Sequence, residues 1–248
     1  MTVFFLCYKT ESTAYQFGPS PGLISFTFDE NNRPDTRNDL LALGFLTSNK
    51  NGALVRVDSA TTADYFQLEL VDGNVLAVYN LGTEDIDIGD LGIKVNDGKY
   101  HIVRFTRSGQ NSTLQIDNHN VITRSPAGKQ LNIFNRHAYI QIGGHKNILR
   151  GVIEKPFIGI IAGLVFNGHR LLDMAAEDDP RIKTEGDLEL MISIGNQQTM
   201  AITPPTSNND HLNNQMLAEP KSPYANDDLI YSSAGSGCFD VNEDEVMM

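Results

Sequence analysis

Apolar and polar residues alternate with a period of two in several short segments of the chain. In residues 65–70, apolar side chains occupy every second position, and residues 113–117 and 138–142 repeat the pattern. Successive side chains of a β-strand point to opposite faces, so this alternation predicts strands with one apolar and one polar face. Residues 75–79 and 158–166 are apolar on both faces, which indicates strands in the middle of a sheet or beneath a second layer.

Glycine-containing dipeptides separate these segments. They are Asn51-Gly52, Asp72-Gly73, Asp97-Gly98, Ser108-Gly109 and Asn167-Gly168. Such dipeptides close β-hairpins because glycine, asparagine and aspartate tolerate the positive φ that tight hairpin turns need. No stretch longer than about ten residues has a helical period, and only residues 171–177 are predicted to form a helical turn or two. Many short strands separated by turns predict an all-β fold, an antiparallel β-sandwich.

The Asp72-Gly73 turn sets the register of one predicted hairpin. If these two residues form the turn, Val71 pairs with Asn74. Continuing the ladder outward then brings Asp64 opposite Leu81 at the open end. A carboxylate and a backbone carbonyl would share one rim of the sandwich, and two hard oxygen ligands form half of a calcium site. An aspartate at a strand end also commonly forms a turn, so both interpretations remain open at this point.

Acidic residues outnumber basic ones. The 248 residues include 31 Asp and Glu against 19 Lys and Arg, which gives a formal net charge of −12 at pH 7. A protein that binds nucleic acid or an anionic membrane needs a basic face, so this charge argues against both classes. No apolar run approaches the roughly 20 residues that span a bilayer. The two cysteines, Cys7 and Cys238, lie near opposite ends and outside any disulfide or zinc pattern.

The chain divides into one large domain and two flanking segments. Residues 195–248 hold eight acidic residues and one lysine among Pro-, Asn- and Ser-rich stretches, so we expect a disordered acidic stalk or linker. Residues 1–14 include a short apolar run that is similar to the start of a secretory signal but lacks a basic leader and sufficient length. We interpret them as a poorly ordered segment or a truncated signal, which leaves residues 15–194 as the folded domain.

Groups that could carry catalysis are scattered along the sequence. The six histidines form no metalloprotease or thiol–disulfide motif, and no nucleophile, base and orienting group come together. Residues 84–90 resemble a calcium loop but lack the glycine and the closing glutamate of an EF-hand, so we expect a solvated acidic loop. The sequence therefore predicts that the protein is not an enzyme.

Two modification sites are predicted for a secreted chain. Asn111 is the acceptor of an Asn-Ser-Thr sequon that follows the Ser108-Gly109 turn. Ser236 precedes a glycine in the acidic tail, which is the usual setting for glycosaminoglycan attachment. A plain flexible linker is the favoured interpretation of the same tail residues, and attachment at Ser236 is the alternative.

Several blocks of the sequence resemble the laminin G-like (LNS) domains of neurexins. They are residues 32–37, 54–59, 95–107 (VNDGKYHIVRFTR), 125–128, 131–135 and 142–144. The blocks occur in the family's order and at its spacing, and the similarity extends from about residue 15 to residue 194. The domain that they resemble is the last such domain of the neurexins, and the acidic tail is similar to the start of the neurexin stalk.

The resemblance implies a jelly-roll-like sandwich of two antiparallel sheets that acts in adhesion across synapses. Calcium (Ca²⁺) at one rim would help to bind postsynaptic neuroligins, and a full-length relative would be a presynaptic, membrane-anchored cell-surface protein. The calcium ligands carried over are the Asp64 carboxylate, the Leu81 and Ile133 carbonyls, and Asn135. Asp64 and Leu81 are also the pair that the hairpin register places together.

The resemblance further implies a partner-binding surface on the same rim. It maps onto Asn31, Asp35, Arg37, Thr62, Lys129, Leu131, Asn132 and Ile133. The family usually has Ser at Asp35, Leu at Thr62, Arg at Lys129 and Thr at Asn132. Asp35 adds repulsion toward an acidic partner, and Lys129 lacks the planar fork that arginine offers a carboxylate. The family's insert between Gly128 and Lys129 is absent, which favours a neuroligin-type partner.

Two other binding functions remain open from the sequence. Related laminin G-like modules are lectin-like, although the even scatter of basic residues argues against sulfated glycans. Other members of the superfamily carry steroids or other hydrophobic ligands in an apolar pocket between the sheets.

Overall fold

The computed structural model describes residues 12–128, 131–147 and 150–191. Its elements are β1 (Ala14–Thr27), β2 (Asn38–Leu46), β3 (Gly52–Ser59), β4 (Tyr65–Val71), β5 (Asn74–Asn80), β6 (Asp85–Gly89), β7 (Tyr100–Ser108), β8 (Asn111–Ile116), β9 (Ile122–Arg124), β10 (His137–Ile142), β11 (His145–Asn147), β12 (Val152–Glu154), β13 (Gly159–Phe166), β14 (His169–Arg170), α1 (Leu171–Ala176) and β15 (Ile182–Met191). The predicted flanks 1–14 and 195–248 lie almost wholly outside the described residues, as does Ser236, so the domain limits stay a prediction.

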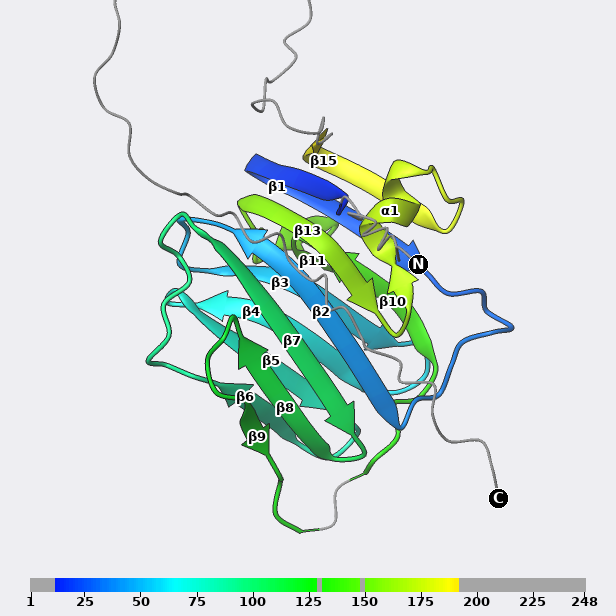
Figure 1. The fold of residues 1–248 in the computed structure, drawn as a ribbon. Helices are drawn as coiled ribbons and strands as arrows, with labels where there is room; N and C mark the ends of the chain where they lie inside the picture. Colours follow the sequence, from blue (N-terminus) through cyan, green and yellow to red (C-terminus); the bar gives the residue numbers. More distant parts are fainter. Residues whose placement is uncertain (1–11, 129–130, 148–149, 192–248) are drawn as a thin grey trace, which may run out of the picture. The chain divides into compact units, whose positions relative to one another are not determined.

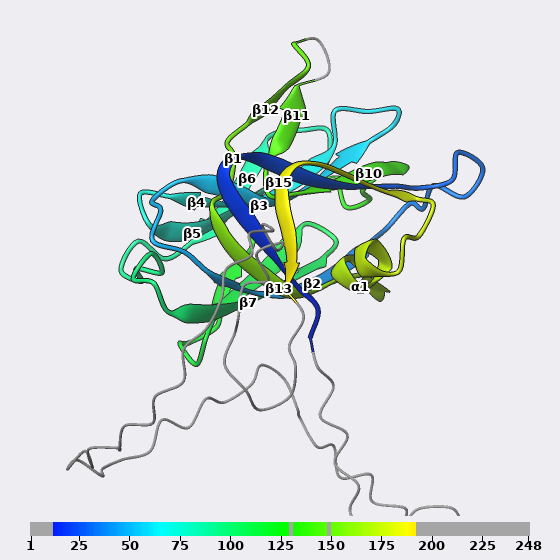
Figure 2. The same ribbon diagram turned by 90° about the horizontal axis from the view of Figure 1, so that it is seen from above.

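One antiparallel sheet folds over on itself to make two layers (Figures 1 and 2). Its hydrogen-bonded order is β6-β5-β4-β3-β10-β1-β13-β2-β7-β8-β9, with β14 paired to β13 and β15 paired to β1. Strand β1 joins the layers because its first half pairs with β13 and its second half with β10. The predicted antiparallel β-sandwich is therefore confirmed.

Strand β1 can join two layers because its middle is irregular. The register of its pairing with β15 shifts between Phe17 and Gly22. Pro19 and Pro21 lie in that interval, and proline cannot donate a backbone hydrogen bond to a ladder. The N–H of Ser20 instead donates to Asp187 Oδ2 at 3.2 Å. The interruption lets the two halves of β1 belong to different layers.

Aromatic side chains fill the space between the layers. The Phe66 ring on β4 lies 4.6 Å from the Phe105 ring on β7, and the Tyr79 ring on β5 lies 6.1 Å from it. Phe66 and Phe105 belong to opposite layers, so their contact links the two halves of the sheet. Aromatic pairs at such separations contribute beyond the apolar area they bury.

Three of the five predicted turn dipeptides lie at hairpins. Asp72-Gly73 joins β4 to β5 with Val71 opposite Asn74, as the sequence predicted, and Asn167-Gly168 joins β13 to β14. The β7–β8 hairpin is closed one residue later than predicted, by Gly109 and Gln110. Asn51-Gly52 and Asp97-Gly98 do not close hairpins, because the strands that they connect pair with other partners. A glycine turn reverses the chain locally but does not decide which strand the chain pairs with next.

Residues 84–90 are not the solvated acidic loop that the sequence predicted. Most of them form strand β6, in which Ile86 and Ile88 are buried while Asp85 and Asp87 are exposed. The isoleucines provide the buried face of a period-two strand, and the acids face outward.

Residues 171–177 behave as predicted, since α1 buries Leu171 and Leu172. No helix among the described residues is long and apolar enough to cross a membrane.

Replacing Gly143 with alanine tests how tightly β10 and β1 pack. Gly143 has φ +85°, and an added Cβ would overlap the Phe17 ring. Gly168 has the same φ but open space around its Cα, so Gly168→Ala is a matched control for backbone strain. We expect Gly143→Ala to lower the free energy of unfolding in urea by about 1–3 kcal/mol more than Gly168→Ala does. Equal losses in the two variants would contradict tight packing of Phe17 against β10.

Candidate functional site

The predicted calcium ligands converge on the rim where β4 begins and β5 ends. A serine-centred turn positions Asp64: Ser59 Oγ accepts hydrogen bonds from the N–H groups of Thr61 and Thr62 at 3.2 and 3.1 Å. The Asp64 carbonyl accepts a further bond from Ser59 N at 3.0 Å. The turn therefore places Asp64 at the rim, immediately before the first residue of β4.

The Asp64 carboxylate contacts a segment that is distant in sequence. Its Oδ2 accepts hydrogen bonds from the backbone N–H and the side-chain Nδ2 of Asn135, at 3.0 and 2.8 Å. Asn135 Nδ2 also lies 3.5 Å from the Ile133 carbonyl. Asp64 is 2% exposed, and its Oδ1 has no hydrogen-bond partner among the described residues. One carboxylate oxygen is therefore committed to Asn135, and the other is unpaired among the described residues.

Leu81 lies beside this carboxylate, one position beyond the last β4–β5 pair. That pair is Tyr65 with Asn80, so the predicted hairpin register is confirmed. After Leu81 the chain turns away at Gly82, whose φ is +95° and whose N–H donates to Asn80 Oδ1 at 2.7 Å. A Cβ added to Gly82 would lie 3.5 Å from Asp64 Oδ1, so the turn at Gly82 passes directly beside that oxygen.

The oxygen donors at this rim fit a calcium ion. Calcium takes carboxylate, amide and backbone carbonyl oxygens, which are the groups that Asp64, Asn135, Leu81 and Ile133 carry. Asn135 presents its Nδ2 to Asp64, so its side chain would turn over to offer Oδ1 to an ion. The described residues include no cluster of three or more His, Cys, Asp or Glu side chains, and one carboxylate among neutral donors corresponds to a weak site.

Most of the predicted partner-binding residues lie in the segments around this site. Leu131 and Ile133 are 52% and 38% exposed, and Arg37 is also exposed. Asp35 Oδ1 accepts a hydrogen bond from Arg136 N at 2.7 Å, and Thr62 donates its hydroxyl to Ser59 Oγ at 2.9 Å. Asn31 and Asn132 are placed in the adjoining loops, whereas Lys129 lies outside the described residues. The predicted glycosylation acceptor Asn111 is exposed at the start of β8.

A buried arginine that sequence reasoning missed holds these segments together. The Arg107 side chain is 1% exposed and forms an ion pair with Asp39 at 2.5 Å. Its Nη1 donates to the carbonyls of Arg37, Gly109 and Asn132 at 3.3, 2.8 and 3.4 Å. Its Nη2 donates to the carbonyl and hydroxyl of Thr36 at 3.0 and 3.2 Å. One guanidinium thus links three segments that form the rim.

The strand alternation contains the signal that would have found Arg107. In β7 the inward positions are His101, Val103, Phe105 and Arg107, so the arginine follows two apolar residues on the core face. A charged residue at an inward position is seldom buried unless it is paired. The pattern therefore predicts a buried ion pair at this strand end, although its partner Asp39 comes from a distant strand.

His137 extends this network into the core. Its Nε2 lies 3.0 Å from the Thr36 hydroxyl, while its Nδ1 is buried with no hydrogen-bond partner among the described residues. The side chain lies against the Phe134 ring at 4.3 Å. Burial lowers the pKa of His137 to about 4, in spite of the nearby Asp39 carboxylate, which raises it. The imidazole is therefore neutral at pH 7.

Comparison with known proteins identifies relatives of the whole domain. A family model for the laminin G domain matches residues 45–169. The chain is 45% identical over 240 residues to neurexin 1 of Drosophila melanogaster, covering 96% of this chain and 12% of that protein. It is 46% identical over 198 residues to neurexin-3-beta of Homo sapiens, covering 78% of this chain and 30% of that protein. It is 42% identical over 226 residues to neurexin-1a-beta of Danio rerio, covering 79% of this chain and 49% of that protein. The chain thus spans at most about half of these relatives.

Solved structures share the fold at low sequence identity. Domains LG4-5 of the mouse laminin alpha1 chain align with a TM-score of 0.57 and 18% identity, covering 72% of this chain and 46% of that one. A heptameric SAP-like pentraxin from Limulus polyphemus aligns with a TM-score of 0.54 and 13% identity, covering 74% of this chain and 96% of that one. At these identities the likeness concerns the fold alone.

Removing the Arg107 guanidinium should destabilise the domain strongly. Arg107→Met leaves Asp39 buried without its cationic partner, and breaking a buried pair in this way costs about 3–5 kcal/mol. Arg104→Met on the same strand is the control, because Arg104 is exposed on the opposite face. Urea unfolding followed by circular dichroism measures both. A loss for Arg107→Met no larger than that for Arg104→Met would show that the network does not hold the rim.

The stability of the domain should depend on pH through His137. Its folded pKa of about 4 is below the ordinary value of 6.5, so the unfolded chain binds the proton first as the pH falls. The stability contributed by the neutral imidazole is full above pH 6.5 and is lost as the pH falls toward about 4, a change on the order of 3 kcal/mol. Urea unfolding in EDTA between pH 7.5 and 4 should show a weaker pH dependence for His137→Gln than for the wild type. His119→Gln, which alters an exposed histidine, should follow the wild type.

Proposed function

The chain belongs to the laminin G domain family and is similar to neurexins over most of its length, and on this basis we propose that it is a calcium-dependent cell-adhesion receptor domain. Laminin G domains of the neurexin kind are adhesion modules of the cell surface and not enzymes. The observation that supports calcium dependence is the Asp64 carboxylate, which keeps one oxygen unpaired beside Leu81, Ile133 and Asn135.

Calcium would change the charge of the rim. Residues 1–194 carry 23 acidic and 18 basic residues, so the domain as a whole is negative. An ion held by Asp64, Asn135 and the carbonyls of Leu81 and Ile133 would neutralise the carboxylate and add positive charge beside the exposed Arg37. Extracellular calcium modules typically bind at about 10⁻⁴–10⁻³ M, and the single carboxylate here places this site in that class. Extracellular calcium concentrations are therefore needed to fill it.

The partner in this proposal is an acidic, neuroligin-like postsynaptic adhesion protein. The exposed Leu131 and Ile133 side chains provide an apolar anchor, and Arg37 provides a cation next to it. Apolar anchors surrounded by polar groups are the usual centre of a protein interface. The proposed surface is completed by Asp35, Thr62, Asn31, Asn132 and Lys129. Two of these residues, Asp35 and Lys129, reduce its complementarity to an acidic partner.

An extracellular position agrees with the exposed sequon. Asn111 starts β8, directly after the Gly109–Gln110 turn, and it is open to solvent. A glycan can be attached at such a position without disturbing the core. We therefore include N-glycosylation at Asn111 in the proposal; attachment at Ser236 concerns the tail outside the described residues.

Calcium titration of the full chain tests the metal site. Isothermal titration should give weak, saturable binding in the wild type and none in Asp64→Asn, which keeps the side-chain shape but removes the charge. Asp87→Asn is the matched control, because Asp87 is exposed on β6 and its carboxylate faces Arg124 on β9. Absence of heat in the wild type would contradict the calcium mechanism, and equal loss in Asp87→Asn would place the site elsewhere.

Truncating Leu131 tests the partner surface separately. Leu131→Ala should weaken binding to an immobilised neuroligin ectodomain about tenfold while calcium binding is unchanged, because the side chain anchors the interface but offers no ligand. Leu91→Ala is the control: Leu91 is 81% exposed, in the loop that packs on Asn74 at the opposite end of β5. Surface plasmon resonance with and without EDTA gives the affinity of each variant for the ectodomain. Unchanged binding by Leu131→Ala would exclude this anchor.

A further inference from the structure

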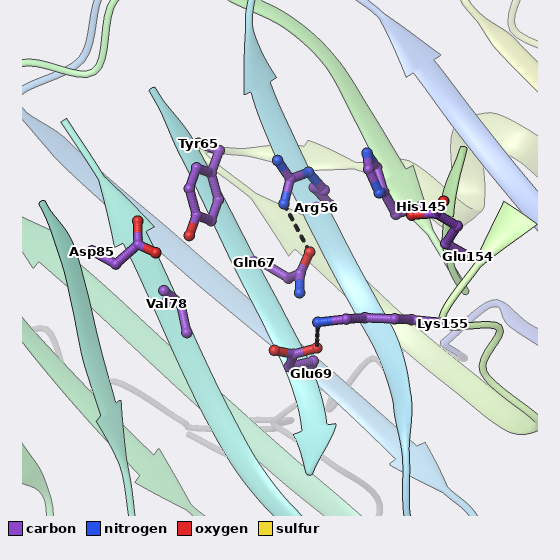
Figure 3. Close-up of a pocket in the computed structure, with 9 residues that line it drawn as sticks. All are labelled: Arg56, Tyr65, Gln67, Glu69, Val78, Asp85, His145, Glu154 and Lys155. Atoms are coloured by element: carbon purple, nitrogen blue, oxygen red, sulfur yellow. Dashed lines mark hydrogen bonds and ion pairs between the residues drawn. The ribbon is translucent and has the colours of Figure 1, made fainter. Parts of the chain in front are cut away.

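A polar cavity of about 330 Å³ opens on the outer face of the layer that contains β3, β4, β5 and β6 (Figure 3). Side chains from these four strands line one part of it. The rest is lined by His145, Glu154 and Lys155, from strands β11 and β12 and the residue after β12. None of the predicted calcium ligands lines the cavity.

Two buried polar side chains lie in this cavity with hydrogen-bonding atoms to spare. Gln67 and Glu69 are only 5% and 7% exposed, although both point away from the apolar core. Gln67 Oε1 accepts from Arg56 at 2.9 Å, and Glu69 Oε2 accepts from Lys155 at 2.5 Å. Gln67 Nε2 and Glu69 Oε1 have no partner among the described residues, and neither atom is sealed from solvent. Both remain available to a ligand, one as a donor and one as an acceptor.

The wall of the cavity is held in place before any ligand binds. Arg56 is fixed by two hydrogen bonds from its Nε to Asp58, at 2.9 and 3.1 Å, and lies 4.4 Å over the Tyr65 ring. Burial and a hydrogen bond to Asp85 raise the pKa of Tyr65 to about 12, so the phenol keeps its proton. Asp85 also accepts from Asn80 Nδ2 at 2.9 Å. A site whose side chains are already restrained loses little entropy on binding.

The charges and vacant groups select the class of ligand. Three carboxylates (Glu69, Asp85 and Glu154) and two cations (Arg56 and Lys155) line the cavity, so an anion would meet a lining with excess negative charge. A cation would satisfy the carboxylates but leave the Gln67 donor unpaired. A hydroxyl group both donates and accepts, so a polyol can pair with Glu69 Oε1 and Gln67 Nε2 together. Val78 supplies an apolar surface for the C–H groups of a sugar ring.

We propose that this cavity binds a neutral saccharide, and that it does so without calcium. Its volume is at the lower end of the range for small-molecule sites, which suits one or two sugar rings. The proposal is independent of the adhesion function, because the rim site uses Asp64 and the segment at Asn135 instead. The two sites are distinguished by their response to EDTA.

Nuclear magnetic resonance of the ¹⁵N-labelled full chain tests the proposal. In EDTA, titration with lactose, cellobiose and diacetylchitobiose should shift the Gln67 side-chain amide and the β4 backbone amides in a saturable way for at least one sugar. Glu69→Gln should weaken this binding about tenfold or more. Lys155 would hold the new amide oxygen and turn its nitrogen, a donor, into the cavity. Gln67→Glu converts the vacant donor into an acceptor and should weaken binding similarly.

Two controls separate binding in this cavity from binding elsewhere on the domain and from simple charge attraction. Glu189→Gln changes an exposed residue on β15, which pairs with Gln16 in the first half of β1 and does not line the cavity, and should bind as the wild type does. A sulfated heparin disaccharide should cause no shift at Gln67. The proposal is overturned if none of the three sugars shifts Gln67, if Glu69→Gln and Gln67→Glu bind as the wild type does, or if only the sulfated disaccharide binds.

Discussion

A buried guanidinium at the end of β7 decides how the rim of this sandwich is built. Arg107 cannot reach water, so its charge and its N–H groups must all be satisfied by protein. Asp39 balances the charge, and the remaining donors take carbonyls from Thr36, Arg37, Gly109 and Asn132. One cation thus links three loops through their backbone oxygens.

The order imposed by Arg107 is passed on to the proposed calcium site by backbone pairing. Thr36 and Phe134 exchange two backbone hydrogen bonds, at 2.9 and 2.8 Å, and His137 N donates to the Pro34 carbonyl at 3.0 Å. These contacts fix the segment that carries Ile133 and Asn135, and this segment then meets Asp64 in the turn between β3 and β4. A change in the buried ion pair would thus move a proposed calcium ligand that it never touches.

Sequence reasoning reached the parts of this arrangement that depend on local geometry. The Asp72-Gly73 turn determines the β4–β5 register, so Asp64 and Leu81 could be paired from residue numbers alone. Asn135 could be placed near Asp64 only through the resemblance to neurexins, because the two residues are 71 positions apart in the chain. Arg107 was overlooked although its inward position is visible in the alternation. Its partner Asp39 could not be named, because strand pairing between β2 and β7 is not a local property.

The polar face of β4 shows a second limit of the same kind. The alternation correctly predicted that Gln67 and Glu69 point away from the core, and such a face normally meets water. Both are buried because Arg56 and Lys155 reach across them, and Lys155 follows a hairpin far along the chain. A strand pattern reports the side on which a residue lies, whereas its exposure depends on what covers that side.

The two proposed sites handle the negative charge of the domain in opposite ways. At the rim, Asp64 has only neutral hydrogen-bond partners, so its charge is uncompensated until an ion arrives. On the outer face both cations already have a carboxylate partner, because Lys155 is paired with Glu69 and Arg56 with Asp58. An unbalanced carboxylate suits recognition that is conditional on calcium. A vacant amide donor beside the vacant oxygen of a carboxylate that is already paired suits an uncharged ligand. The same acidic domain can therefore present one calcium-gated surface and one that is indifferent to calcium.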